Sequence, residues 1–134
     1  MGFPITELNV LVVDDVQAVQ TQIRDILRKY GFTFERIFLA SNGEEAKAQL
    51  KDHEIHLILL DWHMTPTNGL EVLKFIRSHQ YYKGIVCIMV TADTLKDSVL
   101  SAVKAGIDDF IVKPFTMERV EAKVHPVLVK KGVI

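Results

Sequence analysis

The stretch HLILLDWHM, residues 56–64, constrains the fold of this chain more than any other. Four consecutive apolar residues, Leu57 to Leu60, lead directly into Asp61, and polar, turn-prone residues follow. An unbroken apolar run of this length is typical of a strand that is covered on both faces, in the middle of a parallel sheet. Ligands bind such sheets at the carboxyl ends of the strands, so Asp61 is predicted to lie at a ligand-binding edge.

Segments with strand and helix patterns alternate along the chain. Apolar runs predict strands at residues 8–13, 36–40, 57–60, 85–90 and 110–112. Apolar residues spaced three and four apart predict helices that begin near residues 16, 41, 68, 94 and 116. This alternation requires right-handed crossovers and a parallel sheet with helices on both faces. The sequence therefore predicts a doubly wound α/β fold, a single domain over residues 1–134 with its core at about 8–125.

Capping residues indicate several helix boundaries. The stretch Ser41-Asn-Gly-Glu44 has the form of a capping box, and Thr94 with Asp97 forms a similar arrangement. Gly31 and Gly106 are expected to end helices, because glycine commonly follows the last helical turn.

Pro126 is unexpected inside the last predicted helix. Proline in a helix interior costs roughly 3 kcal/mol and clashes with the carbonyl four residues before it, here that of Ala122. We therefore expect the last helix to kink or end near residues 124–125. The apolar tail, residues 127–134, could then pack on the domain or on a partner.

Charge and composition argue against several classes of function. A net charge of −1 gives no electrostatic footprint for nucleic acid and no polybasic signal for a membrane surface. No apolar run approaches the roughly 20 residues of a spanning helix, and the first residues lack a signal-peptide pattern. No glycine-rich phosphate loop follows a predicted strand, which argues against a bound nucleotide. The single Cys87, inside an apolar run, suits a reducing cytoplasm and is expected to be a core residue.

Polar side chains are predicted to gather at one edge of the sheet. Each ends or follows a strand: Asp14 and Asp15 the first, Asp61 the third, Thr91 the fourth and Lys113 the fifth. Parallel strands have their carboxyl ends at a common edge, so these side chains can converge. A lone aspartate after a strand is often only a helix cap, and a lone lysine a solvated charge. Five polar residues at four strand ends instead indicate a functional site.

The residue types at this edge favour magnesium and phosphoryl chemistry. Three neighbouring carboxylates raise one another's pKa unless a cation compensates them. Such oxygen ligands suit Mg²⁺, which typically takes one or two carboxylates together with substrate phosphate. A lysine and a hydroxyl on the far side can neutralise and hydrogen-bond phosphoryl oxygens. Asp61, between the acidic pair and the Thr91/Lys113 pair, is then the best-placed nucleophile for phosphoryl transfer.

Five pieces of the sequence, in this order and spacing, match a known family. They are VLVVDD (10–15), LLDWHM (59–64), NGLEVLKFIR (68–77), MVTAD (89–93) and FIVKPFT (110–116). Over essentially its whole length the chain resembles the receiver domain of bacterial response regulators, and most of all the stand-alone receivers of the chemotaxis type. The resemblance implies the flavodoxin-like strand order 2-1-3-4-5, for which the chemotaxis receiver is itself the standard example.

The resemblance also implies a phosphoacceptor and its metal ligands. Asp61 would accept a phosphoryl group from the phosphohistidine of a histidine kinase or phosphotransfer domain. Asp14, Asp15 and Asp61 would hold Mg²⁺ together with the backbone carbonyl of His63. Such a protein is a phosphorylated signalling domain of a two-component system rather than an enzyme, and it works in the cytoplasm.

A switch mechanism follows from the same resemblance. Thr91 would hydrogen-bond the phosphoryl group and Lys113 would pair with it, while Phe110 would change position on activation. The surface around the fourth helix, fifth strand and fifth helix would then bind a downstream target protein, and weak homodimerisation is a further option. The Lys113–Pro114 bond is expected to be cis.

The loop after Asp61 departs from the family pattern. After Met64 the family usually has a proline, but here Thr65 occupies that position and Pro66 follows. His63 places an imidazole two residues past the acceptor, beside the path of an attacking water. His63 and Thr65 are therefore candidates for tuning phosphate hydrolysis.

Two other functions remain open from the sequence. A magnesium-dependent phosphatase with an aspartyl nucleophile would usually carry Asp-x-Asp after its first strand, whereas Asp14 and Asp15 are adjacent. A pseudo-receiver would bind partners without phosphorylation, although the complete set of three aspartates, threonine and lysine argues against it. Turnover of phosphomonoesters would support the first, and phosphorylation-independent partner binding the second.

Overall fold

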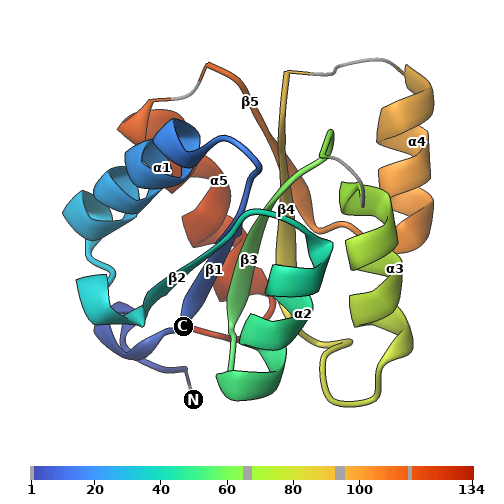
Figure 1. The fold of residues 1–134 in the computed structure, drawn as a ribbon. Helices are drawn as coiled ribbons and strands as arrows, with labels where there is room; N and C mark the ends of the chain where they lie inside the picture. Colours follow the sequence, from blue (N-terminus) through green and yellow to red (C-terminus); the bar gives the residue numbers. More distant parts are fainter. Residues whose placement is uncertain (1, 65–67, 93–95, 115) are drawn as a thin grey trace.

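A single parallel sheet forms the centre of the computed structural model, which describes residues 2–64, 68–92, 96–114 and 116–134. In this described part the sheet has five strands in the order β2-β1-β3-β4-β5, and every neighbouring pair is parallel (Figure 1). The strands are β1 (Val10–Val13), β2 (Ile37–Ala40), β3 (Leu57–Asp61), β4 (Val86–Thr91) and β5 (Asp109–Val112). The predicted doubly wound fold and its strand order are confirmed.

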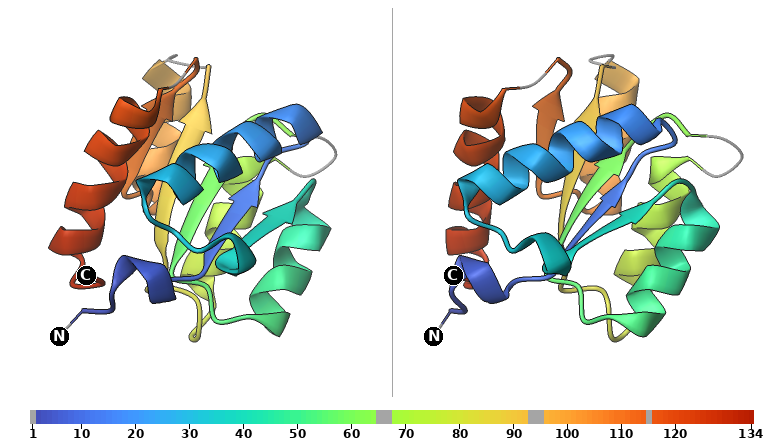
Figure 2. Two further views of the ribbon diagram at one scale, coloured as in Figure 1. Left: turned by 90° about the vertical axis from the view of Figure 1, so that its left-hand side faces the viewer. Right: turned by 60° about the vertical axis from the view of Figure 1, so that its left-hand side comes forward.

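Helices cover both faces of this sheet (Figure 1). Helices α1 and α5 lie on one face, and α2, α3 and α4 lie on the other (Figures 1 and 2). Their bounds are α1 (Gln17–Tyr30), α2 (Gly43–Asp52), α3 (Gly69–Ser78), α4 (Lys96–Ala105) and α5 (Met117–Lys130). In the described residues, no helix is long and apolar enough to cross a membrane.

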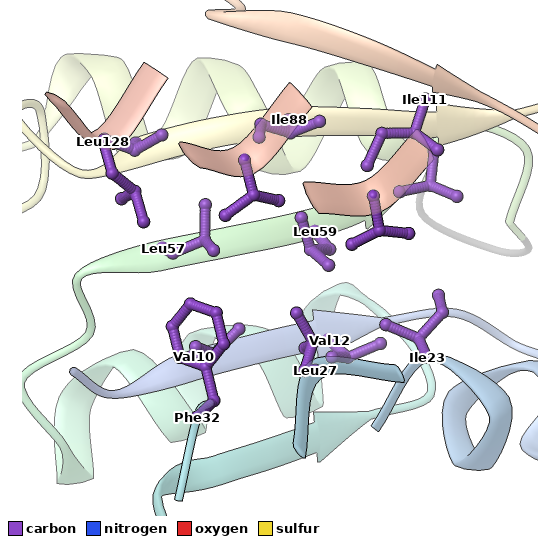
Figure 3. Packing of buried hydrophobic residues seen from close by; sticks show 14 of the residues in the cluster. Val10, Val12, Ile23, Leu27, Phe32, Leu57, Leu59, Ile88, Ile111 and Leu128 are labelled. Carbon is purple, nitrogen blue, oxygen red and sulfur yellow. The ribbon is translucent and has the colours of Figure 1, made fainter. Parts of the chain in front are cut away.

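Side chains on the α1/α5 face form one core layer (Figure 3). Alternate strand residues such as Val12 and Leu59 meet Ile23 and Leu27 of α1, all at most 2% exposed. The apolar positions of α1 recur three and four residues apart, which places them on one side of the helix. Gly31 ends this helix with a φ of 136°, a backbone conformation that favours glycine.

A second core layer lies under α2, α3 and α4 and contains Cys87. Burial raises the pKa of the Cys87 thiol to about 12. This thiol is therefore protonated and enclosed at neutral pH, as expected for a core residue. The outcome confirms the prediction made from its apolar surroundings.

Two helices are capped where the sequence predicts them to begin, and a third cap differs from its prediction by one residue. Asn68 caps α3 and Thr116 caps α5, each accepting a hydrogen bond from a backbone N–H three residues later. At α2, however, the cap is Asn42, and Glu45 accepts a hydrogen bond from the Ser41 N–H at 2.9 Å. The capping box predicted at 41–44 is thus wrong by one residue, because the amide of Asn42 takes the cap position. The predicted Thr94 cap lies outside the described residues.

Helix α5 continues through Pro126 to Lys130, so of the two expected outcomes, a kink or an end near residues 124–125, the end is wrong. Pro126 is exposed, and so is Ala122, whose carbonyl loses its helical donor. Beyond the proline, Val127 and Leu128 are buried, with 8% and 0% of their surfaces exposed. Burial of two such side chains stabilises the last turn by about 1.5–3 kcal/mol each, which offsets the cost of the proline.

Both chain ends lie at the edge of the sheet where the strands begin (Figures 1 and 2). The Phe3 N–H donates a hydrogen bond to the Val133 carbonyl at 2.8 Å. Val133 and Ile134 pack against the core layer under α1 and α5. The tail therefore packs on its own domain.

Candidate functional site

The five polar residues singled out in the sequence lie at the carboxyl-end edge of the sheet. Asp61 and Thr91 are the last residues of β3 and β4. Asp14 and Asp15 directly follow β1, and Lys113 directly follows β5. All strands are parallel and in register across the sheet, so these positions share one edge.

Three carboxylates meet at this edge. Asp14, Asp15 and Asp61 each offer one oxygen, and these atoms lie within 4.8 Å of one another. Asp14 and Asp61 are buried, at 1% and 6% exposure, whereas Asp15 is exposed. The cluster thus has two enclosed acids and one that faces solvent.

Lys113 bridges the two buried acids. Its Nζ lies 3.1 Å from Asp14 Oδ2 and 3.5 Å from Asp61 Oδ1. The backbone N–H of Lys113 donates to the carbonyl of Thr91 at 2.9 Å, which ties the ends of β4 and β5 together. Thr91 itself is 2% exposed. The Lys113–Pro114 bond is cis, as expected.

The carboxylates carry more negative charge than Lys113 compensates. Burial raises the pKa of Asp61, the Asp14 carboxylate raises it further, and the Lys113 ammonium partly opposes both effects. A hard divalent cation would remove this conflict, because it favours ionised carboxylates and accepts oxygen ligands alone. The three aspartates therefore fit a magnesium ion both in donor type and in charge.

The start of α3 lies directly against the backbone of Asp61. The Gly69 N–H donates to the Trp62 carbonyl at 3.0 Å. A Cβ at residue 69 would lie 2.5 Å from the Asp61 carbonyl oxygen and 2.9 Å from the Trp62 Cα. No residue other than glycine fits this approach. From the sequence we predict only that a helix begins near residue 68, and the sequence carries no signal for the close approach of Gly69 to Asp61.

A buried glutamine also reaches the site. Gln20 of α1 is 4% exposed, and its Nε2 donates a hydrogen bond to the Asp14 carbonyl at 2.6 Å. We did not single out this residue from the sequence. The available signal is its position, since residue 20 lies on the apolar face of α1 that also carries Ile23 and Leu27.

The remaining predicted residues lie around this centre. Phe110 of β5 is half-buried and packs against the core layer under α4, beside Met89 of the neighbouring strand. His63 is exposed and borders a hollow of about 250 Å³ that is also lined by Trp62 and residues of α3 and α4. Thr65 lies outside the described residues.

Comparison with known proteins assigns the chain to a family. Residues 10–125 match the model of the response regulator receiver domain. The chain is 35% identical over 122 residues to the chemotaxis protein CheY homolog of Campylobacter jejuni, covering 90% of this chain and 92% of that protein.

Solved structures agree with this assignment. The response regulator TrrA from Thermotoga maritima, in complex with Mg²⁺ and BeF, has a TM-score of 0.78 and 32% identity, covering 90% of this chain and 99% of that one. The CheX–CheY–BeF₃–Mg²⁺ complex from Borrelia burgdorferi has a TM-score of 0.82 and 32% identity, covering 90% and 89%. The chain therefore belongs to the response regulator receiver domain family, within which it is similar to CheY-type chemotaxis proteins.

Proposed function

We propose that this receiver domain is a phosphoacceptor in two-component signalling and that Asp61 is the acceptor. The observation that carries the proposal is the meeting of three carboxylates within 4.8 Å, with the Lys113 ammonium between the two buried ones. A carboxylate, a compensating lysine and a metal-type acidic cluster are the groups that phosphoryl transfer requires.

The proposed reaction transfers a phosphoryl group between two side chains. The phosphorus–nitrogen bond of a phosphohistidine on a kinase or phosphotransfer domain breaks, while a bond forms between phosphorus and an Asp61 oxygen. Asp14 and Asp15 would hold Mg²⁺ with Asp61 and the His63 carbonyl, and the ion would neutralise charge on the phosphoryl oxygens. Lys113 would pair with the phosphoryl group on the other side.

The domain would signal through contact with a target protein rather than by turnover of substrate. The acyl phosphate would carry roughly −1.5 to −2 charges in place of the single negative charge of the Asp61 carboxylate, and Thr91 would hydrogen-bond the new oxygens. Phe110 borders a hollow of about 300 Å³ between β5 and α5. Val103 of α4 and Val112 of β5 expose 54% and 41% of their surfaces. A change at Thr91 and Phe110 would alter this surface. The protein would act in the cytoplasm, where histidine kinases present their phosphohistidines.

Phosphorylation by acetyl phosphate in the presence of Mg²⁺ tests the acceptor. Mass spectrometry of the wild-type protein should show one added phosphoryl group of aspartyl type, and Asp61→Asn should show none. An Asp109→Asn variant is the matched control, because Asp109 is a carboxylate at the opposite end of β5 that pairs with Lys123 instead. Robust aspartyl phosphorylation of Asp61→Asn would refute the assignment.

Binding of Mg²⁺ provides a separate test. Trp62 is buried directly after Asp61, and its fluorescence should change on titration with millimolar Mg²⁺. Calorimetry should give the same affinity. A flat fluorescence titration together with no heat of binding would count against the acidic site.

A further inference from the structure

Gln20 is a buried amide that contacts the ends of two strands. Its Nε2 lies 2.6 Å from the Asp14 carbonyl oxygen, 3.1 Å from the Ala40 carbonyl oxygen and 3.0 Å from Ser41 Oγ. Carbonyl oxygens only accept hydrogen bonds, so the nitrogen of this amide, and not its oxygen, must face them. One side chain of α1 thus joins the carboxyl end of β1 to that of β2.

The other bonding groups of Asp14 already have partners. Its N–H donates to the Ala40 carbonyl at 3.0 Å, Oδ1 accepts from the Val16 N–H at 2.8 Å, and Oδ2 accepts from Lys113 at 3.1 Å. Gln20 supplies the bond to the backbone carbonyl. Through these contacts the conformation of Asp14 is determined at both its backbone and its side chain.

The bond to this carbonyl also orients the next residue. The carbonyl of Asp14 and the nitrogen of Asp15 belong to one planar peptide unit, so fixing the oxygen fixes the direction in which the chain continues to Asp15. Asp15 is exposed and outside the strand, where the sheet ladder no longer constrains it. Gln20 is therefore placed to set the angle between the two neighbouring carboxylates of the acidic cluster.

We propose that Gln20 is a positioning residue for the magnesium site, and that its amide sets the Mg²⁺ affinity through the Asp14–Asp15 peptide. This inference rests on the proposed function. Removing a residue that hydrogen-bonds to a metal ligand without touching the metal typically changes the metal affinity about 10- to 100-fold. We expect the lower end of that range, about tenfold, because Lys113 and Val16 still hold the Asp14 carboxylate.

The chain contains a matched control for this bond. Gln49 of α2 also donates from Nε2 to a strand carbonyl, that of Leu39, at 3.2 Å. Leu39 lies one residue before the end of β2 and is not a neighbour of an acidic residue of the site. Gln20→Met and Gln49→Met both remove the amide and keep the length of the side chain. They differ in whether the freed carbonyl belongs to the acidic cluster.

The test measures Mg²⁺ binding by Trp62 fluorescence and by calorimetry for the wild type and both variants. Gln20→Met should bind Mg²⁺ about tenfold more weakly, and Gln49→Met should stay within twofold of wild type. The Mg²⁺ concentration that half-saturates phosphorylation by acetyl phosphate should rise in the same proportion for Gln20→Met. Its rate at saturating Mg²⁺ should stay close to that of the wild type, because Asp61 and Lys113 are untouched.

A loss of fold is separated from a loss of positioning by thermal unfolding with and without Mg²⁺. Loose packing alone would lower both midpoints equally, whereas lost positioning reduces the rise that Mg²⁺ produces. Gln20→Asn, which keeps the amide but shortens its reach, is the second variant and should weaken binding as well.

Equal Mg²⁺ affinity in the wild type and in folded Gln20→Met would overturn the inference and leave the proposed function intact. Equal weakening in the Gln20→Met and Gln49→Met variants would overturn it too, because the effect would then be general. A wild-type protein that neither binds Mg²⁺ nor is phosphorylated would refute the proposed function, and this inference with it.

Discussion

Replacing Gly69 with alanine is expected to disturb the edge of the sheet that carries Asp61, through backbone crowding alone. The added Cβ would lie 2.5 Å from the Asp61 carbonyl oxygen and 2.9 Å from the Trp62 Cα, and both are backbone atoms. No rotamer change can relieve such contacts, so either the start of α3 or the end of β3 must move. The Gly69 N–H bond to the Trp62 carbonyl would lengthen as a result.

The size of the effect follows from known costs of overpacking. Inserting a methyl group into a filled site typically costs about 1–3 kcal/mol, and alanine recovers at most about 1 kcal/mol through its helix propensity. We expect a net loss of about 1–2 kcal/mol. With an unfolding entropy of about 2.1 cal/mol/K per residue over 134 residues, the melting temperature should fall by about 4–7 °C.

Gly84→Ala is the control for this substitution, because in the described part of the chain no atom other than those of its two chain neighbours lies within 4 Å of a Cβ at residue 84. Urea unfolding followed by circular dichroism should show no loss of stability for Gly84→Ala and a lower midpoint for Gly69→Ala. Gly69→Ala should also slow phosphorylation of Asp61, whose carbonyl must shift. Equal stability of the two variants would refute the claim that this contact is tight.

Two further outcomes follow from burial. Asp61→Asn should raise the free energy of unfolding at pH 7 without Mg²⁺, because only the folded state with an ionised Asp61 bears the cost of burying that charge. Each pH unit by which the folded-state pKa of Asp61 exceeds its ordinary value corresponds to about 1.4 kcal/mol. The gain should fade as the pH falls through this raised pKa toward the ordinary pKa of aspartate, and urea unfolding at several pH values measures it; a destabilised variant at pH 7 would contradict the sign. Leu128→Ala should cost about 2–5 kcal/mol, and Val129→Ala, at a half-exposed position, should cost far less. Similar unfolding midpoints for these two variants would show that the turn after Pro126 is not packed as described.

The alternation of strands and helices along the chain could be predicted because each step rests on a local pattern, whereas the order of the strands within the sheet is implied only by the resemblance to the receiver family. The apolar run before Asp61 predicts a buried strand, and a parallel sheet places Asp14, after the neighbouring strand β1, and Lys113, after the edge strand β5, at the same edge as Asp61. The convergence of the acidic residues then follows from the topology alone. Their roles in phosphoryl transfer remain predictions that the experiments above address.

Contacts between distant segments could not be predicted in the same way. The approach of Gly69 to Asp61 depends on the path of the loop between them, and no periodicity encodes that path. Pro126 misled the sequence interpretation because its local cost is visible in the sequence, whereas the burial of Leu128 is not. Gln20 was not singled out because its partners, the Asp14 carbonyl after β1 and the Ala40 carbonyl at the end of β2, depend on how α1 packs against the sheet.

The pairing of the chain ends has a practical consequence for protein engineering. Because the Phe3 N–H reaches the Val133 carbonyl at 2.8 Å, a short glycine-rich linker would suffice to join the first residues to the last. New ends could then be opened in an exposed loop, which gives a circularly permuted variant. The chain ends lie at the edge of the sheet where the strands begin, and the acidic cluster lies at the edge where they end. An affinity tag or a fluorescent fusion attached to the chain ends would therefore leave the approach to Asp61 unobstructed (Figure 1).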